Sequence, residues 1–185
     1  SIEYGGFYDC NLLQSVDLSG LTNLKTIGDR AFYHCGNLTS VDFSGCTNLT
    51  TIGEYAFYYI MKLQSFDFTG CTNLQTIKRY AFYAACYSSG NAGTYTTLDF
   101  TDCSNLQTIG TYAFRYCYAL TSVNFTGCTN LNTIETYAFR NCNFLTEIII
   151  PSGIRDLITS SNFDSWVSTS SSETTVNGIT TIVKN

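Results

Sequence analysis

The sequence predicts a repeat solenoid, a stack of similar coils whose strands lie side by side in a parallel β-sheet. Residues 24–48 (LKTIGDRAFYHCGNLTSVDFSGCTN) and residues 49–73 (LTTIGEYAFYYIMKLQSFDFTGCTN) share a length of 25 residues and the same landmarks. The pattern begins again at Leu74, Leu106 and Leu131. A fixed period of about 20–50 residues is the sequence signature of a repeat architecture.

The second observation is the spacing of apolar residues within a coil. In the second coil the apolar positions are Leu38, Val41, Phe43, Cys46, Leu49, Ile52 and Phe57. Residues 41–44 alternate apolar and polar side chains, which is typical of a short half-buried strand. We therefore expect strands near residues 13–18, 38–43, 63–68, 95–100, 120–125 and 145–150. Residues 52–57 favour a single helical or 3₁₀ turn.

The third observation is that one coil is too small to fold alone. A fully buried apolar side chain gains roughly 1.5–3 kcal/mol, whereas ordering the backbone costs about 1–2 kcal/mol per residue. Stacked coils bury both faces of each layer, so the array folds where one coil does not.

These patterns resemble a known family. The pattern LxxVxFxxC at residues 38–46 resembles the core of a leucine-rich repeat, and IGxxAF at residues 52–57 resembles the BspA-like class of such repeats. The resemblance covers about residues 7–150. It departs from the family where prolines often end the strand, because Ser or Thr stands there in all coils before Pro151.

The resemblance implies a right-handed superhelix, with a parallel sheet on its concave face and short helical or 3₁₀ turns on its convex face. It also implies surface proteins of bacteria, and of some protists, that adhere to host or matrix molecules. We therefore expect an extracellular or cell-surface location and a protein or glycan ligand.

Residues 1–150 are expected to form the solenoid. Residues 1–12 form a partial coil, in which Phe7 and Cys10 occupy the Phe and Cys positions. An insertion near residues 84–94 falls between the convex turn and the strand. Such an insertion is either a tolerated Gly/Ser surface loop or a loop that binds a partner.

Residues 151–185 are expected to be a degenerate last coil and a C-terminal cap. Asn177-Gly178 lies between two strand-forming runs, which is a strong hairpin signal. Phe163 and Trp166 are expected to cover the last coil, although Trp166 alternatively provides a platform for a ligand.

Composition excludes several classes of function. The formal net charge is −5 and only 12% of the residues are charged. Nucleic-acid binding needs a basic stripe, which is missing from the sequence. The sequence contains no apolar run of about 18 residues, so it predicts no membrane span. The sequence also shows no catalytic motif, and its single histidine, His34, occupies a position that is freely exchanged between coils. We therefore predict no enzyme activity and no cofactor.

The nine cysteines predict buried free thiols that act as small hydrophobic side chains. Cysteines in neighbouring coils, such as Cys46 and Cys71, come within disulfide range, but their side chains point inward in parallel. No C-x-x-C pair or Cys/His cluster supports a zinc site.

The first candidate binding surface lies on the concave face. Outward-pointing strand residues form an acidic column, which consists of Asp17, Asp42, Asp67, Asp99 and Asn124. A flanking column of hydroxyls includes Ser40, Ser65 and Ser122. Carboxylates about 5 Å apart repel one another and need compensation. Hydrogen bonds from Ser and Thr, a basic or hydroxyl-rich ligand, or a bound cation are the three alternatives.

The second candidate surface lies on the convex turns, where a column begins with Arg30 and continues as the aromatic column Tyr55, Tyr80, Tyr112 and Tyr137. Amphipathic tyrosines suit binding surfaces because they lose little rotamer entropy. The alternative is that these rings shield the edges of the coils.

The favoured function is a non-enzymatic binding or adhesion module. The competing interpretation is a structural protein that stacks end to end into a filament, because a solenoid without caps exposes an apolar layer and an unpaired strand edge. The candidate ends are Phe7, Val16, Val176 and Ile182. A modest local cap, or a longer array with earlier coils, is the alternative to self-assembly.

Overall fold

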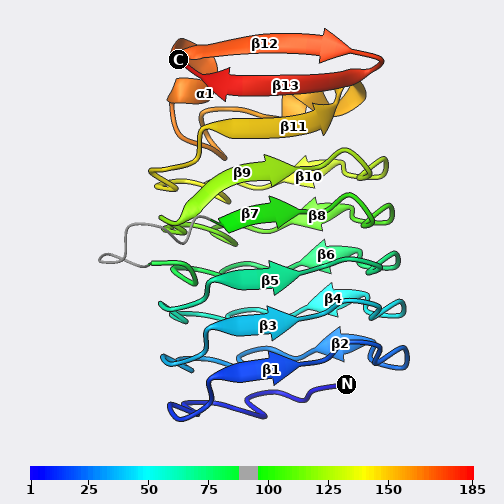
Figure 1. The fold of residues 1–185 in the computed structure, drawn as a ribbon, viewed down its shortest axis with the longest axis vertical. Helices are drawn as coiled ribbons and strands as arrows, with labels where there is room; N and C mark the ends of the chain where they lie inside the picture. The colour runs from blue at the N-terminus through cyan, green and yellow to red at the C-terminus, as the bar shows by residue number, and fades with distance from the viewer. Residues whose placement is uncertain (88–95) are drawn as a thin grey trace.

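The computed structural model describes residues 1–87 and 96–185 and confirms the solenoid of stacked coils (Figure 1). One row of strands consists of β1 (Ser15–Asp17), β3 (Ser40–Asp42), β5 (Ser65–Asp67), β7 (Thr96–Asp99), β9 (Leu120–Asn124) and β11 (Glu147–Pro151). All six lie where the sequence predicts strands. The pairing is parallel and in repeat register, with Val16 opposite Val41 and Val41 opposite Phe66. Strands β1, β3 and β5 form one sheet, and β7, β9 and β11 belong to a second sheet that continues the row.

A second row of parallel strands was not predicted. It consists of β2 (Thr26–Ile27), β4 (Thr51–Ile52), β6 (Thr76–Ile77), β8 (Thr108–Ile109) and β10 (Thr133–Ile134). Each strand contributes one half-buried Thr and one buried Ile. Two residues are too few for a periodicity signal, so the sequence pattern does not reveal them.

The connection after each short strand is a series of tight turns, not the helical or 3₁₀ turn that we expected. Backbone N–H groups in this turn donate to the next coil, as from Phe32 to Ala56 (2.7 Å) and from His34 to Tyr58 (2.9 Å). One position of the turn has a left-handed φ of 56–62° in every coil, at Arg30, Tyr55, Tyr80, Tyr112 and Tyr137. Left-handed geometry costs roughly 1–2 kcal/mol per residue. The alternating conformation aims these N–H groups along the solenoid axis, where the inter-coil hydrogen bonds offset that cost.

Stacked phenylalanines fill the core between the two rows of strands. In the inner column, Phe57 lies between Phe32 and Phe82, with ring centroids 4.9 Å away on both sides. The side chain of Phe57 is fully buried. Because the rings repeat at the spacing of the coils, one aromatic position per coil builds a continuous apolar spine.

The cysteines occur as free thiols, and all except the half-buried Cys10 are buried. Each thiol at a coil corner points at a main-chain carbonyl of the preceding coil. Cys46 donates to Leu18 (3.1 Å) and Cys71 donates to Phe43 (3.2 Å). The thiols therefore pack as small side chains, as predicted, and also link neighbouring coils through weak hydrogen bonds.

The C-terminal end is closed by the 3₁₀ helix η1 (Ser152–Leu157), the short helix α1 (Trp166–Thr169) and the hairpin of β12 (Ser171–Val176) and β13 (Ile179–Lys184). Asn177 and Gly178 have φ values of 51° and 77°, as a type I′ hairpin turn requires. Phe163 is buried and stacks on Phe139 at 4.7 Å. Trp166 is 6% exposed. It therefore belongs to the cap and offers no platform for a ligand.

Candidate binding surfaces

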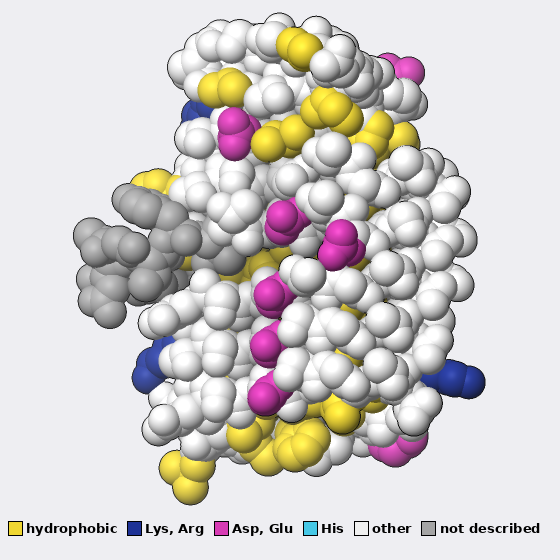
Figure 2. All heavy atoms as spheres, turned by 45° about the vertical axis from the view of Figure 1, so that its right-hand side comes forward, with side chains coloured by type: hydrophobic (Ala, Val, Ile, Leu, Met, Phe, Trp, Pro, Cys, Tyr) yellow, Lys and Arg dark blue, Asp and Glu magenta, His cyan; other side chains and the backbone are white. Residues whose placement is uncertain are grey.

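The acidic column lies along the face of the first strand row, where Figure 2 shows its carboxylates one above another. Asp17, Asp42 and Asp67 occupy equivalent positions at the ends of β1, β3 and β5. Each side chain accepts a hydrogen bond from the backbone N–H two residues later. The N···O distances are 2.9 Å for Asp17, 2.8 Å for Asp42 and 2.8 Å for Asp67.

The remaining members behave alike. Asp99 accepts from the N–H of Thr101 (2.9 Å) and Asn124 from that of Thr126 (3.0 Å). Each residue therefore closes an Asx turn at the end of its strand. Backbone N–H groups are the compensation found in every coil. Side-chain hydroxyls add to it from Thr101 and Thr126.

The hydroxyl column stands in register beside the acidic column, with Ser40 opposite Ser65. Ser122 Oγ donates to Thr97 Oγ1 (3.1 Å), so it is engaged within the column. Hydrogen bonds from Ser19 lower the pKa of the Asp17 carboxyl. These hydrogen bonds stabilise the ends of the strands, so both columns have a structural role within the coils.

We expect Asp67→Ala to lower the free energy of unfolding by about 0.5–1.5 kcal/mol, because the N–H of Thr69 loses its acceptor. Asp67→Asn should cost less, since the amide oxygen accepts the same bond and like-charge repulsion with Asp42 disappears. Asn124 already plays this part in its own coil. Urea denaturation of both variants measures the difference. An equal loss from the two substitutions would contradict the Asx-turn role.

The aromatic column on the turns is a ladder of stacked rings. Centroid distances are 4.9 Å from Tyr55 to Tyr80, 4.8 Å from Tyr80 to Tyr112 and 5.4 Å from Tyr112 to Tyr137. All four side chains are half-buried. The ring faces are thus covered by neighbouring rings, and the hydroxyl of Tyr55 accepts a hydrogen bond from Arg79 (3.2 Å).

A second ladder runs beside the first. Tyr8, Tyr33, Tyr58 and Tyr83 stack at 4.9, 5.2 and 5.0 Å. Edge-to-face contacts join the ladders, as between Tyr55 and Tyr58 (5.3 Å). Burial raises the pKa of Tyr58 to about 12, so its hydroxyl stays a hydrogen-bond donor at physiological pH. Sequence periodicity places Arg115 and Arg140 at the equivalent positions of the later coils.

Arginines lie over rings of the first ladder and over the neighbouring Tyr116. The guanidinium carbon of Arg79 lies 5.3 Å from the Tyr80 ring, that of Arg115 lies 4.5 Å from the Tyr116 ring and that of Arg140 lies 4.8 Å from the Tyr137 ring. Such cation–π contacts fix the orientation of a charged group at low entropic cost. We call this surface the Tyr/Arg face, which consists of Tyr55, Tyr58, Tyr80, Tyr83, Tyr112, Tyr116, Tyr137, Arg30, Arg79, Arg115 and Arg140.

Acidic residues neutralise only part of the Tyr/Arg face. Arg79 Nε lies 3.7 Å from Glu54, with both side chains solvent-accessible. Arg115 Nε donates to Asn141 (3.4 Å) and its guanidinium also donates to the hydroxyl of Tyr116 (2.9 Å). The face therefore presents fixed positive charge beside phenolic hydroxyls.

The small pocket around His34 does not assemble a reactive group. Its volume is about 210 Å³, and His34 Nδ1 lies 3.7 Å from a carboxylate oxygen of Asp9 at an exposed position. The imidazole stacks on Tyr33 at 4.2 Å. Within residues 1–87 and 96–185, no cluster of three or more His, Cys, Asp or Glu side chains is arranged to hold a metal ion.

The predicted assembly ends differ from one another. Phe7 is 41% exposed and Val16 is half-buried at the N-terminal end. Val176 is 61% exposed in the C-terminal hairpin. Ile182 is not exposed at all, because β13 is the middle strand between β11 and β12. Ile182 therefore belongs to the core and cannot contribute to an end surface. The inserted segment of residues 88–95 lies outside the described residues.

Comparison with known families decides the identity of the repeat. The sequence matches the BspA type leucine rich repeat region, in six copies, over residues 1–95 and 87–185. The chain belongs to the BspA-type leucine-rich repeat family.

One solved structure shares the fold of this BspA-type repeat chain. It is the crystal structure of a leucine rich cell surface protein from Faecalibacterium prausnitzii A2-165, with a TM-score of 0.54 and 20% sequence identity. The similarity covers 95% of this chain and 44% of that chain, so the repeat chain spans less than half of its neighbour's length. Among curated proteins, none matches the sequence. No helix within the described part of the chain is long and apolar enough to cross a membrane.

Arg79, Arg115 and Arg140 of this BspA-type chain are the part of the Tyr/Arg face that sequence reasoning missed, whereas Arg30 was placed in the convex column. Arg79 stands directly before a column tyrosine, whereas Arg115 and Arg140 follow the core phenylalanine of their coils. Because they come from different repeat positions, no single column of the alignment contains them. The signal for Arg115 and Arg140 is that Arg replaces Tyr at the position of the second ladder.

Proposed function

We propose that this chain is a non-catalytic binding module displayed at the cell surface, and that its Tyr/Arg face contacts the ligand. The observation that carries the proposal is the double ladder of tyrosines, with Arg79, Arg115 and Arg140 fixed over rings of its first column. Tyr and Arg are, with Trp, the residue types enriched at the energetic centres of protein interfaces.

The chemistry of the face suggests the class of ligand. Ring faces are occupied by neighbouring rings, as between Tyr55 and Tyr80, so stacking of a sugar ring on them is blocked along the ladder. Phenolic hydroxyls, ring edges and guanidinium groups remain available. These groups favour carboxylate, sulfate or main-chain carbonyl oxygens. An acidic protein segment or an acidic glycan is therefore the ligand that we propose.

The acidic column is a weaker candidate, because each of its side chains already accepts a backbone hydrogen bond within its own coil, as Asp42 does from Ser44. A surface location agrees with the family and with the description of the structurally similar protein as a cell surface protein. Both points support the proposal through analogy.

Filament formation by end-to-end stacking is less well supported. The outermost strand at the C-terminal end is β12, whose residue opposite the buried Ile182 is Glu173. Glu173 forms an ion pair with Arg155. On the other side of β13, the residue opposite Ile182 is the buried Ile148 of the last coil. A charged residue at a sheet edge opposes further strand addition.

An array of proteins and glycans, probed with the whole chain, tests the proposal. We expect binding to acidic ligands that the triple variant Arg79→Gln, Arg115→Gln and Arg140→Gln weakens at least about tenfold, because it removes three fixed charges at the contact. Binding should also fall with rising salt.

The matched control is the triple variant Asp42→Asn, Asp67→Asn and Asp99→Asn, which preserves the Asx turns. Its binding should equal that of the parent. The opposite pattern, with loss in the Asp variant and none in the Arg variant, would transfer the site to the acidic column. Binding that neither triple variant changes would exclude both surfaces.

A further inference from the structure

Two arginines of the Tyr/Arg face stand at equivalent positions of adjacent coils. Arg115 and Arg140 each follow the core phenylalanine of their coil, one repeat period of 25 residues apart. Their guanidinium carbons lie 5.9 and 4.8 Å from the centre of the same ring, that of Tyr137. The N–H of Tyr116, the residue after Arg115, donates to the carbonyl of Arg140 (3.1 Å). The two positive charges are therefore gathered around one ring.

Arg115 is held in place from several sides. Its guanidinium carbon lies 5.2 Å from the ring centre of Tyr112 and 4.5 Å from that of Tyr116. Its Nε donates to Asn141 (3.4 Å), and one terminal nitrogen donates to the hydroxyl of Tyr116 (2.9 Å). A guanidinium group has five N–H donors, so those on the other terminal nitrogen stay available. Because the group is already oriented, it loses little entropy when it binds a ligand.

These two charges have no acidic partner. In the part of the chain that the structure describes, no carboxylate lies within ion-pair distance of Arg115 or Arg140. Arg79, by contrast, lies 3.7 Å from a carboxylate oxygen of Glu54. The carboxylate of Asp164 accepts a backbone N–H of the same turn (3.0 Å). Like charges at neighbouring positions repel each other, so an anion from outside the chain is the compensation that the pair leaves open.

The geometry of the pair favours one kind of anion. A carboxylate has two oxygens in one plane, and a single guanidinium fork satisfies both. A sulfate or phosphate ester has three terminal oxygens, which accept from two guanidinium groups at once. We propose that Arg115 and Arg140 form a subsite for the sulfate esters of an acidic glycan. This inference rests on the proposed function and narrows its ligand.

The rings around the subsite favour a sugar as the carrier of the ester. Tyr112 and Tyr137 stack on each other at 5.4 Å, and guanidinium groups lie against both rings. A sulfated tyrosine of a partner protein therefore finds no free ring face on which to stack its own ring. A sulfated sugar needs only the N–H and O–H donors that the subsite provides.

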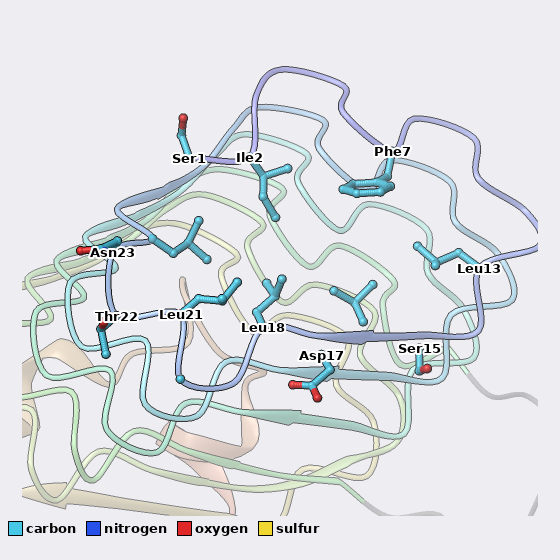
Figure 3. A pocket seen from close by; sticks show the side chains of 13 residues that line it. Ser1, Ile2, Phe7, Leu13, Ser15, Asp17, Leu18, Leu21, Thr22 and Asn23 are labelled. Carbon is cyan, nitrogen blue, oxygen red and sulfur yellow. The ribbon is translucent and has the colours of Figure 1, made fainter.

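The apolar pocket beside β1 is a contrasting surface (Figure 3). Its volume is about 660 Å³, and its lining includes Val16, Leu18 and Leu21. The charged side chain in that lining is Asp17, which repels an anion. We therefore expect the anionic ligand at the turns and not in this pocket.

Two chondroitin hexasaccharides, one with sulfate esters and one without, test the inference. Both contain the same carboxylates, so the comparison isolates the sulfate group. We expect the whole chain to bind the sulfated form at least about tenfold more tightly in isothermal titration calorimetry, because the charge-assisted hydrogen bonds to the ester are added. A peptide with sulfated tyrosines and one with phosphoserines, both matched to the sulfated hexasaccharide in net charge, should bind more weakly than it does.

Single variants locate the subsite on the face. Arg115→Gln and Arg140→Gln should each reduce the preference for the sulfated form to about twofold or less, because one of the two forks is gone. Arg140→Lys keeps the charge but loses the fork, so the preference should fall here as well. Arg140 is exposed, so its variants should keep the parent's circular dichroism spectrum. Arg79→Gln is the matched control and should lower the affinity for both hexasaccharides by the same factor, with the preference unchanged.

Equal affinity for the two hexasaccharides would overturn the inference, as would a preference that survives both Arg115→Gln and Arg140→Gln. If the triple Arg variant still loses its binding to acidic ligands in either case, the proposed function stands and only the sulfate subsite fails. Tighter binding of the sulfated-tyrosine or phosphoserine peptide would also overturn it, since the ligand would then be a protein. Absence of binding to every acidic ligand would overturn the subsite and the proposed function together.

Discussion

Replacing Phe57 by alanine should lower the free energy of unfolding by about 3–5 kcal/mol. The ring is fully buried and stacks between Phe32 and Phe82 at 4.9 Å on each side. It also makes an edge-to-face contact with Phe43 at 5.6 Å. Its removal leaves a cavity that both neighbouring coils line, and the close packing of stacked coils gives little room for collapse.

Phe7→Ala is the matched control, since Phe7 belongs to the same column at its open end. Its ring is 41% exposed and stacks only on Phe32. We expect a loss of about 1 kcal/mol or less, as one ring face loses contact and no closed cavity forms. Urea denaturation followed by circular dichroism measures both variants. Equal losses at Phe7 and Phe57 would contradict the account of the spine as a ladder that gains stability from both neighbours of each ring.

The apolar spacing predicted the position of each strand in the first row because those residues repeat and alternate. The core residues follow from the same spacing, as Val41 and Phe43 illustrate. Asn177-Gly178 predicted the hairpin because a type I′ turn needs positive φ at both central residues. In these cases, local sequence and tertiary packing favour the same structure.

The turns show where sequence reasoning stops. Tyr80 has a φ of 56°, a conformation that bulky side chains rarely adopt in isolation. It persists because its N–H donates to Thr111 in the next coil (3.0 Å). A propensity argument takes one coil at a time, so it cannot include a bond that exists only between coils. The strand Thr76–Ile77 was missed for another reason, because two residues are too few to show a periodicity.

The candidate surfaces were predicted in part. Their columns follow from the repeat, so Asp42 and Tyr80 are indeed aligned with their equivalents. What each column does depends on contacts outside the pattern. The backbone N–H of Ser44 occupies the Asp42 carboxylate, and the guanidinium of Arg79 lies over the Tyr80 ring. The first contact weakens the case for the acidic column and the second strengthens that for the turns.

Raising the pH from 9 to 12 should unfold the protein, and this is the second large effect that we expect. Burial raises the pKa of the Cys35 thiol to about 11, and that of Cys71 and Cys128 to about 12, from an ordinary value of 9.0. Burial likewise raises the pKa of Tyr58 to about 12. In the unfolded chain these thiols ionise near pH 9, and tyrosines near pH 10.

The sign of the effect follows from proton binding. Because the folded state holds these protons more tightly than the unfolded state, their stabilising contribution is fully present below pH 9 and is lost as the pH rises through the folded-state pKa values. Circular dichroism during a titration from pH 8 to pH 12 should show a cooperative loss of signal, and adding salt should not prevent it, since the cause is desolvation more than surface charge.

A thiol titration checks the cause of that unfolding. At pH 8 only the half-buried Cys10 should react readily with Ellman's reagent, whereas all nine cysteines should react in guanidinium chloride. In the double variant Cys71→Ala and Cys128→Ala, the free energy of unfolding should fall less between pH 8 and pH 12 than it does in the parent. The reason is that two buried ionisable groups are gone. Rapid reaction of all thiols in the folded protein at pH 8, or a spectrum unchanged at pH 12, would show that the stacked coils do not protect their thiols as the structure requires.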